Sequence, residues 1–246
     1  MNQSENFRSL IWGVHPVEEA LLARKSFNKI LVNKEIRSST FDNIFKMCRQ
    51  LHIPIQKVPV QKLNSLTRKK HQGIIGLMSP VFFYKIDQIL PTFFETGKHP
   101  LVLILDGVTD MRNFGAVIRS AAAFDVDAII IHEVGGPPVT ADTIKTSAGT
   151  IFKVKICKER YLKKTVSFLK NSGLQVIAAT EKSENVLSSV NFELPTAIIM
   201  GAEDKGISSD LLKTVHKTVK IPINKNIDSL NISVAAGIIL YEVRRT

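Results

Sequence analysis

The sequence contains few of the residues that build disulfide frameworks and metal centres. It has two cysteines, Cys48 and Cys157, which lie far apart along the chain. Such a pair is typical of reduced thiols rather than of a disulfide or a metal site. The six histidines are scattered without ligand spacing, so we expect no metal ion.

Long apolar runs are also missing. No stretch approaches the ~18 consecutive apolar residues that would indicate a membrane span. The N-terminal MNQSENFRSL lacks the basic start and the apolar segment of a signal peptide. We therefore expect a cytoplasmic protein without a membrane-bound part.

Several common active-site signatures do not occur. The sequence has no G-x-G-x-x-G after a predicted strand, which disfavours a nicotinamide-type Rossmann site. It also has no G-x-x-x-x-G-K-[ST], no G-x-S-x-G and no H-E-x-x-H.

Basic residues are abundant and unevenly distributed. The formal net charge is +11. Residues 1–97 contain 14 Lys and Arg against 7 Asp and Glu, whereas residues 98–246 contain 19 against 15. A basic excess favours a polyanionic partner such as a nucleic acid, although solubility alone can also explain it. The charge does not distinguish RNA from DNA.

The hydrophobic pattern predicts an α/β protein of two parts. Residues 1–79 read as a small α/β domain, and the Pro-containing residues 80–98 as a connection. Within 99–246, short apolar, β-branched runs predict strands at 101–105, 128–131, 151–156, 174–179, 196–200 and 218–223. Between several of them lie predicted helices at 115–124, 140–147, 159–171, 208–216 and 229–244. This alternation predicts a mostly parallel sheet with helices on both faces. In such sheets the ligand crevice lies beyond the carboxyl ends of the strands.

Three loops at those strand ends contain candidate site residues. The first, DGVTDMRNFGAVIRSAAAF at 106–124, contains Asn113 and Arg119. Arginine suits bidentate phosphate binding, but Arg119 also fits an ordinary surface position. Asn113 fits a helix N-cap equally well. The second loop, GAEDKGIS at 201–208, contains Glu203 between two glycines, and on spacing alone it also fits a plain turn.

The third loop is IPINKNIDSLN, which precedes an apolar C-terminal helix. Asp228 and Ser229 fit helix caps. Asn231 would fall in the first turn of a helix that appears apolar on every side and therefore buried, where an amide needs a partner.

Together the three loops resemble the motifs of the SpoU/TrmH branch of the SPOUT RNA methyltransferases. LDGVTDMRNFGAVIRSA is similar to the first motif, IIMGAEDKGIS to the second and IPINKNIDSLNISVAAGIILYE to the third. The N-terminal IWGVHPVEEAL and HQGIIGLM resemble the L30e-like substrate-binding domain of RlmB-type enzymes, which methylate guanosine riboses of 23S rRNA. The resemblance implies a deep trefoil knot, S-adenosylmethionine as the methyl donor, ribose 2'-O-methylation of RNA and a homodimer.

The resemblance also implies roles for individual residues. Arg119 would approach the target ribose, assisted by Asn113 and Glu203, and it would serve either its own or the partner's cofactor. Ser229 and Asn231 would position the arginine and the attacking oxygen. The backbone around three residues would hold S-adenosylmethionine: Gly201, Ile221 and Leu230.

Other functions fit parts of the pattern. The same chemistry on transfer RNA is one alternative. A non-catalytic RNA-binding or ribosome-assembly protein with this fold is a second, and an α/β nucleotide-binding protein without an RNA partner is a third. The three motifs argue against a non-catalytic protein. The resemblance favours 23S rRNA over transfer RNA, because minimal transfer-RNA enzymes of this branch tend to lack the dedicated N-terminal domain.

Overall fold

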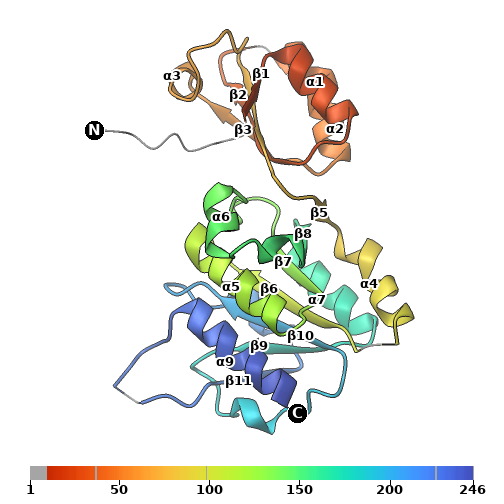
Figure 1. Cartoon of the computed structure of the whole chain (residues 1–246), viewed down its shortest axis with the longest axis vertical. Coiled ribbons are helices and arrows are strands. Elements are labelled where there is room, and N and C mark those ends of the chain that lie inside the picture. The colour runs from red at the N-terminus through yellow and green to blue at the C-terminus, as the bar shows by residue number, and fades with distance from the viewer. Residues whose placement is uncertain (1–9, 37, 98, 225, 246) are drawn as a thin grey trace. The chain divides into compact units, whose positions relative to one another are not determined.

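The computed structural model describes residues 10–36, 38–97, 99–224 and 226–245 (Figure 1). The chain forms two compact units. Unit 1 is Met1–Phe82 with Pro138–Ala141, and unit 2 is Phe83–Pro137 with Asp142–Thr246. No helix in the described ranges is long and apolar enough to cross a membrane.

Unit 1 is a four-stranded sheet with helices packed against it. Its strands follow the order β1-β4-β2-β3, in which β2 and β3 are parallel and the other pairs antiparallel. The elements are β1 (Leu10–Trp12), α1 (Val14–Leu22), β2 (Phe27–Asn33), η1 (Ser38–Phe41), α2 (Asp42–Gln50), β3 (Ile55–Val58), α3 (Val60–Asn64) and β4 (Ile74–Met78).

Unit 1 has a separate apolar core on each side of its sheet. The larger core joins buried residues of α1 and α2 to the sheet, including Val17, Leu21 and Ile44. The smaller one packs Leu63 of α3 against Leu31 and Ile75. The N-terminal sequence therefore forms the small α/β fold expected for it.

Unit 2 is a seven-stranded sheet in the order β11-β9-β10-β6-β7-β8-β5, and every neighbouring pair is parallel. Its strands are β5 (Phe83–Tyr84), β6 (Leu101–Asp106), β7 (Ala128–His132), β8 (Lys155–Glu159), β9 (Gln175–Ala179), β10 (Thr196–Gly201) and β11 (Lys217–Val219). Its helices are α4 (Ile86–Glu95), α5 (Met111–Ala123), α6 (Ala141–Thr146), η2 (Thr150–Phe152), α7 (Leu162–Asn171), η3 (Leu187–Ser189), α8 (Ser209–Leu212) and α9 (Ile232–Arg245). The predicted parallel α/β architecture is confirmed.

Helices cover both faces of this sheet, which explains its continuous apolar strands. Alternate strand residues such as Val102 and Ile104 share a core with α4, α7 and α8. On the other face α5 and α9 pack against each other, and α9 also contacts β10 (Figure 1). Every residue of β6 is accordingly buried.

The segment expected to connect the domains forms structure instead. Phe83–Tyr84 pair with β8, and α4 follows them as part of unit 2. Pro91 lies inside α4, where proline normally disfavours a helix. Three buried residues at helical spacing, Ile86, Leu90 and Phe93, pack onto the sheet and offset that cost.

Two further local predictions differ from the structure. The run at 151–156 was expected to be a strand, but Thr150–Phe152 form a 3₁₀ turn and β8 begins at Lys155. The last helix begins at Ile232, not at residue 229, and it is not buried on every side. Val234, Ile238 and Tyr241 are 51%, 39% and 57% exposed, because α5 and the sheet cover only the opposite face of α9.

Candidate functional site

The three predicted loops meet at the carboxyl edge of the unit 2 sheet. β6 and β10 are neighbours, and their register places Asp106 beside Gly201 at the ends of the two strands. The loop after β6 leads into α5, and the loop after β10 passes the start of α9. Sequence-distant polar residues are thereby brought to one place.

Glu203 is the centre of this site. Its Oε1 accepts hydrogen bonds from Asn113 Nδ2 at 3.2 Å, from Asn231 Nδ2 at 2.5 Å and from the backbone N–H of Ile232 at 3.0 Å. Asn231 Nδ2 also donates to Asn113 Oδ1 at 3.0 Å. One residue from each predicted loop thus joins a single hydrogen-bonded group.

The structure decides between the two interpretations of Asn113. The N-cap of α5 is Asp110, whose Oδ1 accepts from the N–H groups of Arg112 and Asn113 at 2.9 and 2.8 Å. The Asn113 side chain is therefore not needed as a cap and is available to the site.

The cap of α9 was assigned to the wrong residues. Asp228 and Ser229 precede the helix by several positions and do not cap it, whereas Asn231 Oδ1 accepts from Ser233 N at 2.9 Å and from Ser233 Oγ at 2.5 Å. Asn231 lies just before the helix and both caps it and bonds Glu203. The carboxylate of Glu203 next to this N-terminus is favoured by the helix dipole.

Asp106, at the carboxyl end of β6, holds the 201–208 loop in place. It is 7% exposed, and its two oxygens accept from His132 Nε2 at 2.9 Å and from Ser208 N at 2.8 Å. Burial alone would raise the pKa of Asp106, but the hydrogen bonds from His132 and Ser208 outweigh it and hold the pKa below its ordinary value. The carboxylate thus stays ionised and fixes the 201–208 loop to β6.

Gly201 is required by the close return of that loop. A Cβ at Gly201 would lie 2.1 Å from the Gly206 carbonyl carbon and 2.3 Å from Ile207 N. Gly206 has φ of +65°, in the left-handed region. Both glycines of GAEDKGIS therefore have a backbone role.

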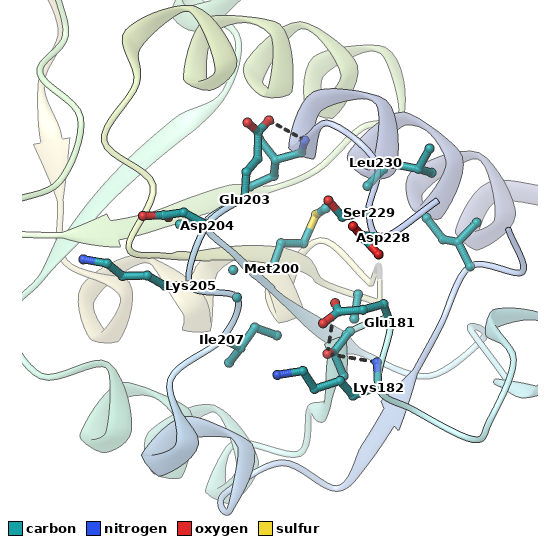
Figure 2. Close-up of a pocket in the computed structure, with 18 of the residues that line it drawn as sticks. Glu181, Lys182, Met200, Glu203, Asp204, Lys205, Ile207, Asp228, Ser229 and Leu230 are labelled. Carbon is teal, nitrogen blue, oxygen red and sulfur yellow. Dashed lines mark hydrogen bonds between the residues drawn. The ribbon is translucent and has the colours of Figure 1, made fainter. Parts of the chain in front are cut away.

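A pocket of about 290 Å³ opens beside Glu203 (Figure 2). Its walls come from the segments after β9 and β10, from Ile221, Ile223 and residues 228–230, and from α9. The predicted cofactor residues Gly201, Ile221 and Leu230 all line it, as does Ser229. Its volume is at the lower end of the roughly 300–1,000 Å³ typical of small-molecule sites.

The pocket also contains charged residues that the sequence analysis did not single out. Glu181 and Lys182 follow β9, and Asp204 and Lys205 follow Glu203 (Figure 2). The loop that contains Asp204 and Lys205 also fitted a plain turn on spacing alone, and these two residues were given no role in the site. The rule that ligands bind beyond strand carboxyl ends also applies to β9 and would have indicated Glu181.

Arg119 lies apart from this group. It is exposed on α5 and has no hydrogen bond or ion pair within the described part of the chain. Six residues separate it from Asn113, which corresponds to about 9 Å along a helix and a different helix face. The structure therefore joins Asn113, Glu203 and Asn231 directly but not Arg119.

The cysteines and histidines form no metal centre among the described residues. Cys48 and Cys157 are both buried free thiols. Burial raises the pKa of Cys48 to about 12, and mainly burial raises that of Cys157 as well. Both thiols are therefore protonated and inert as ligands at neutral pH.

Fold and pocket together define an α/β protein that binds a small ligand at the carboxyl edge of a parallel sheet. Residues 100–241 match the SpoU rRNA Methylase family, and residues 10–84 match RNA 2'-O ribose methyltransferase substrate binding. The chain belongs to the SpoU family of RNA methyltransferases.

Individual relatives agree with this assignment. A Staphylococcus aureus (strain MSSA476) protein of the TrmH family of tRNA/rRNA methyltransferases is 33% identical over 96% of each chain. The crystal structure of an RNA 2'-O ribose methyltransferase is 25% identical with a TM-score of 0.56, covering 96% of this chain and 87% of that one.

Two further solved structures are similar over different lengths. AdoMet-bound rRNA methyltransferase from Sinorhizobium meliloti shares the fold with a TM-score of 0.61 at 22% identity, over 96% of this chain and 86% of that one. The A. aeolicus TrmH/SpoU tRNA modifying enzyme is 27% identical with a TM-score of 0.55. It covers 65% of this chain and 83% of its own length.

Proposed function

We propose that this chain is an S-adenosylmethionine-dependent ribose 2'-O-methyltransferase that modifies a guanosine of 23S rRNA. The observation that carries the proposal is the hydrogen-bonded group of Asn113, Glu203 and Asn231 at the mouth of the pocket. It holds polar groups from three loops in fixed positions beside a small-molecule site, which is what an in-line transfer between two substrates requires.

The pocket residues fit S-adenosylmethionine. Met200, Ile221 and Leu230 offer apolar surface for an adenosine, and Glu181 and Lys182 supply both charges for a zwitterionic amino acid. The Sinorhizobium meliloti relative was solved with AdoMet bound, which supports the same ligand here. When bound, S-adenosylmethionine supplies an electrophilic methyl group on a sulfonium.

Each predicted residue then has a role in the transfer. Gly201, Ile221 and Leu230 would hold the cofactor through backbone contacts, and Ser229 would orient the groups that face the ribose. Asn113 and Glu203 would assist Arg119 at the ribose 2'-hydroxyl. Its oxygen would form a bond to the methyl carbon while the methyl–sulfur bond breaks, so that S-adenosylhomocysteine is left and the hydroxyl proton is released to solvent. Asn231 is a positioning residue, because its amide is held by Glu203 and Ser233.

The exposed face of α9 supports a homodimer. Val234, Ile238 and Tyr241 recur at helical spacing on one side of α9 and are all exposed in the single chain. A second copy packed on this face would bury them and would bring Arg119 of the partner subunit to the pocket. This arrangement explains why Arg119 lies away from Glu203 within one chain.

A deep trefoil knot, in which the C-terminal segment passes through a loop of the chain, is part of the same proposal. The pocket walls support it, because residues 201–207, residues 228–230 and α9 come together from separate passes of the chain.

The extra N-terminal unit favours ribosomal RNA over transfer RNA. Unit 1 matches a family described as RNA substrate binding, and the A. aeolicus tRNA modifying enzyme covers only 65% of this chain. With such an RNA substrate, we propose that the protein acts in the cytoplasm and that the transfer needs no metal ion.

The test is transfer of labelled methyl from S-adenosylmethionine to unmodified 23S rRNA and to unmodified tRNA, followed by nuclease digestion to locate the label. Arg119→Ala should lose transfer while its affinity for S-adenosylmethionine stays within about twofold of wild type. Label at one guanosine ribose of 23S rRNA supports the proposal.

Two other results would change the proposed function. Label on tRNA alone would keep the chemistry and replace the substrate. No label on either RNA, together with no cofactor binding, would leave a non-catalytic RNA-binding protein.

A further inference from the structure

The carboxyl edge of the unit 2 sheet extends beyond the pocket to an exposed aromatic residue. The strand register aligns the ends of four adjacent strands, placing Gly201 beside Asp106 and His132 beside Glu159. Glu203 lies two residues beyond the end of β10, and Tyr161 lies two residues beyond the end of β8. Tyr161 therefore lies on the same edge as the catalytic group.

Tyr161 is exposed but held between cations. It keeps 56% of its surface accessible. The guanidinium of Arg160 lies 5.4 Å from the ring centroid, and Lys164 Nζ lies 5.3 Å from it. These contacts are near the outer limit of cation–π interaction, so they orient the ring without covering it.

The surroundings of Tyr161 are positively charged. Lys163 is a third exposed cation, and none of the three cations forms an ion pair within the described ranges. The adjacent carboxylate of Glu159 turns inward, where Oε1 accepts from Ile86 N at 2.9 Å. α7 begins at Leu162 without an acidic residue in its first turn, so its N-terminal dipole adds to the positive potential.

We infer that Arg160, Tyr161, Lys163 and Lys164 form a binding platform for single-stranded RNA near the methylated nucleotide. A base stacks on the Tyr161 ring, and the three cations bind the flanking phosphates. Aromatic rings flanked by basic residues are how proteins bind unpaired nucleotides. This inference rests on the proposed function, because it names a second contact made by the same RNA.

The spacing of the sheet sets the distance from the pocket. β8 is three strands from β10 and four from β9, the two strands whose ends line the pocket. At about 4.8 Å per strand, the platform lies about 14 to 19 Å across the edge from the pocket strands. The platform therefore contacts a nearby nucleotide of the same RNA strand, not the target ribose.

The experiment measures binding of the full-length protein to a fluorescently labelled, mixed-sequence single-stranded RNA 12-mer and to 23S rRNA. Tyr161→Ala should weaken RNA binding by about 5-fold or more, the usual loss when a stacking ring is removed. Tyr161→Phe keeps the ring and should stay within about twofold of wild type.

A matched control comes from the opposite edge of the sheet. Phe152 is 63% exposed and is followed by Lys153, but it precedes β8 and so lies at the amino edge. Phe152→Ala should leave RNA affinity unchanged. An equal loss in Phe152→Ala, or no loss in Tyr161→Ala, would overturn the platform.

Salt dependence separates the two kinds of contact. Arg160→Gln and Lys164→Gln should each lower the slope of log Kd against log salt concentration by about 1. Tyr161→Ala should leave that slope unchanged because it removes no charge. An unchanged slope in both charge variants would contradict phosphate binding here.

Methyl transfer distinguishes failure of the platform from failure of the proposed function. If wild type methylates RNA and Tyr161→Ala has the same KM for that RNA, the platform is wrong and the function stands. If wild type methylates neither RNA, the proposed function fails, and the 12-mer titrations still decide whether Tyr161 binds RNA.

Discussion

At the scale of single residues, Glu203 connects more of the site than any other side chain described above. One oxygen receives three donors, two from side chains and one from the first backbone N–H of α9. Glu203 therefore connects the N-terminus of α9 to Asn113 and Asn231, the side chains proposed to assist the reaction at the ribose.

Replacing Glu203 should separate these two contributions. Glu203→Ala removes the acceptor for Ile232 N and should cost about 1 kcal/mol of unfolding free energy, as loss of a helix-terminal acceptor does. Glu203→Gln keeps an acceptor oxygen and should cost less, although both variants should lower kcat for methyl transfer. Urea unfolding and single-turnover methylation measure the two effects; equal stability of the two variants would contradict the acceptor role.

Burial of Lys158 should make the stability of the protein depend on pH. Lys158 is 7% exposed, and its Nζ lies 3.6 Å from the Phe83 ring centroid. Burial lowers the pKa of Lys158 to about 7, against a smaller opposing effect of Glu133. Between pH 7 and about 10.5 the unfolded chain binds this proton and the folded chain does not, so stability rises with pH across that window.

Lys158→Met should remove that rise. The variant should be more stable than wild type near pH 7, on the order of 1 kcal/mol or more, and the difference should shrink toward pH 10. Glu133 keeps a partner in the variant, because Lys85 Nζ lies 2.8 Å from its Oε2. Thermal unfolding from pH 6 to 9.5 measures the effect, with the exposed Lys217→Met as control; a pH-independent difference would show that lost packing, not charge, is responsible.

At the scale of elements, the 201–208 loop has the least room for change. Gly201→Ala would force a Cβ against the backbone of Gly206 and Ile207, so the loop must move. We expect a loss of 1 to 3 kcal/mol, about the cost of overpacking, together with weaker S-adenosylmethionine binding.

The neighbouring glycine supplies the control for that prediction. A Cβ at Gly206 meets open space, so Gly206→Ala costs only the left-handed backbone penalty of about 1 to 2 kcal/mol. Calorimetric titration with S-adenosylmethionine compares the two variants. Tighter binding by Gly201→Ala than by Gly206→Ala would contradict the steric argument.

Elements with regular apolar spacing were the most predictable from sequence. The strands around 101–105, 128–131, 174–179 and 196–200 could be recognised because burial on both faces requires continuous apolar runs. The β5–α4 segment could not be recognised, because Pro91 makes its sequence unlike that of a helix. The helix is stabilised by packing of Ile86 and Leu90 against sheet strands that come later in the sequence.

The site was predictable to a similar extent. The ends of parallel strands indicated the three loops, but Asn113, Glu203 and Asn231 were given site roles only through the resemblance of these loops to the family motifs. The capping roles of Asp110 and Asn231 could not be assigned, since several adjacent residues of the same polar type precede each helix. Only coordinates distinguish such neighbours.

At the scale of the whole molecule, the exposed face of α9 predicts association. The sequence could not show whether Val234, Ile238 and Tyr241 are buried within one chain or between two chains, because either kind of burial gives the same apolar spacing along the helix.

Replacing one of them should test the dimer. Ile238→Lys places a charge at the centre of the face and should yield monomers in light scattering, with far-UV circular dichroism like that of wild type. Because the pocket would then lack Arg119 of the partner subunit, methyl transfer should fall in parallel. The control is Lys217→Met, an exposed change elsewhere in unit 2; monomeric wild type would refute the dimer.

Unit 1 is not continuous in the sequence. Pro138–Ala141 belong to it, and Val139 is fully buried there. Its N–H donates to Asn28 Oδ1 at 3.0 Å, and its carbonyl accepts from Asn28 Nδ2 at 2.8 Å. During synthesis, unit 1 therefore cannot be completed when residue 82 has emerged. The peptide 138–141 is synthesised only after β5, β6 and β7, so a gene fragment cut at residue 82 encodes a unit without the buried Val139 and its two hydrogen bonds to Asn28.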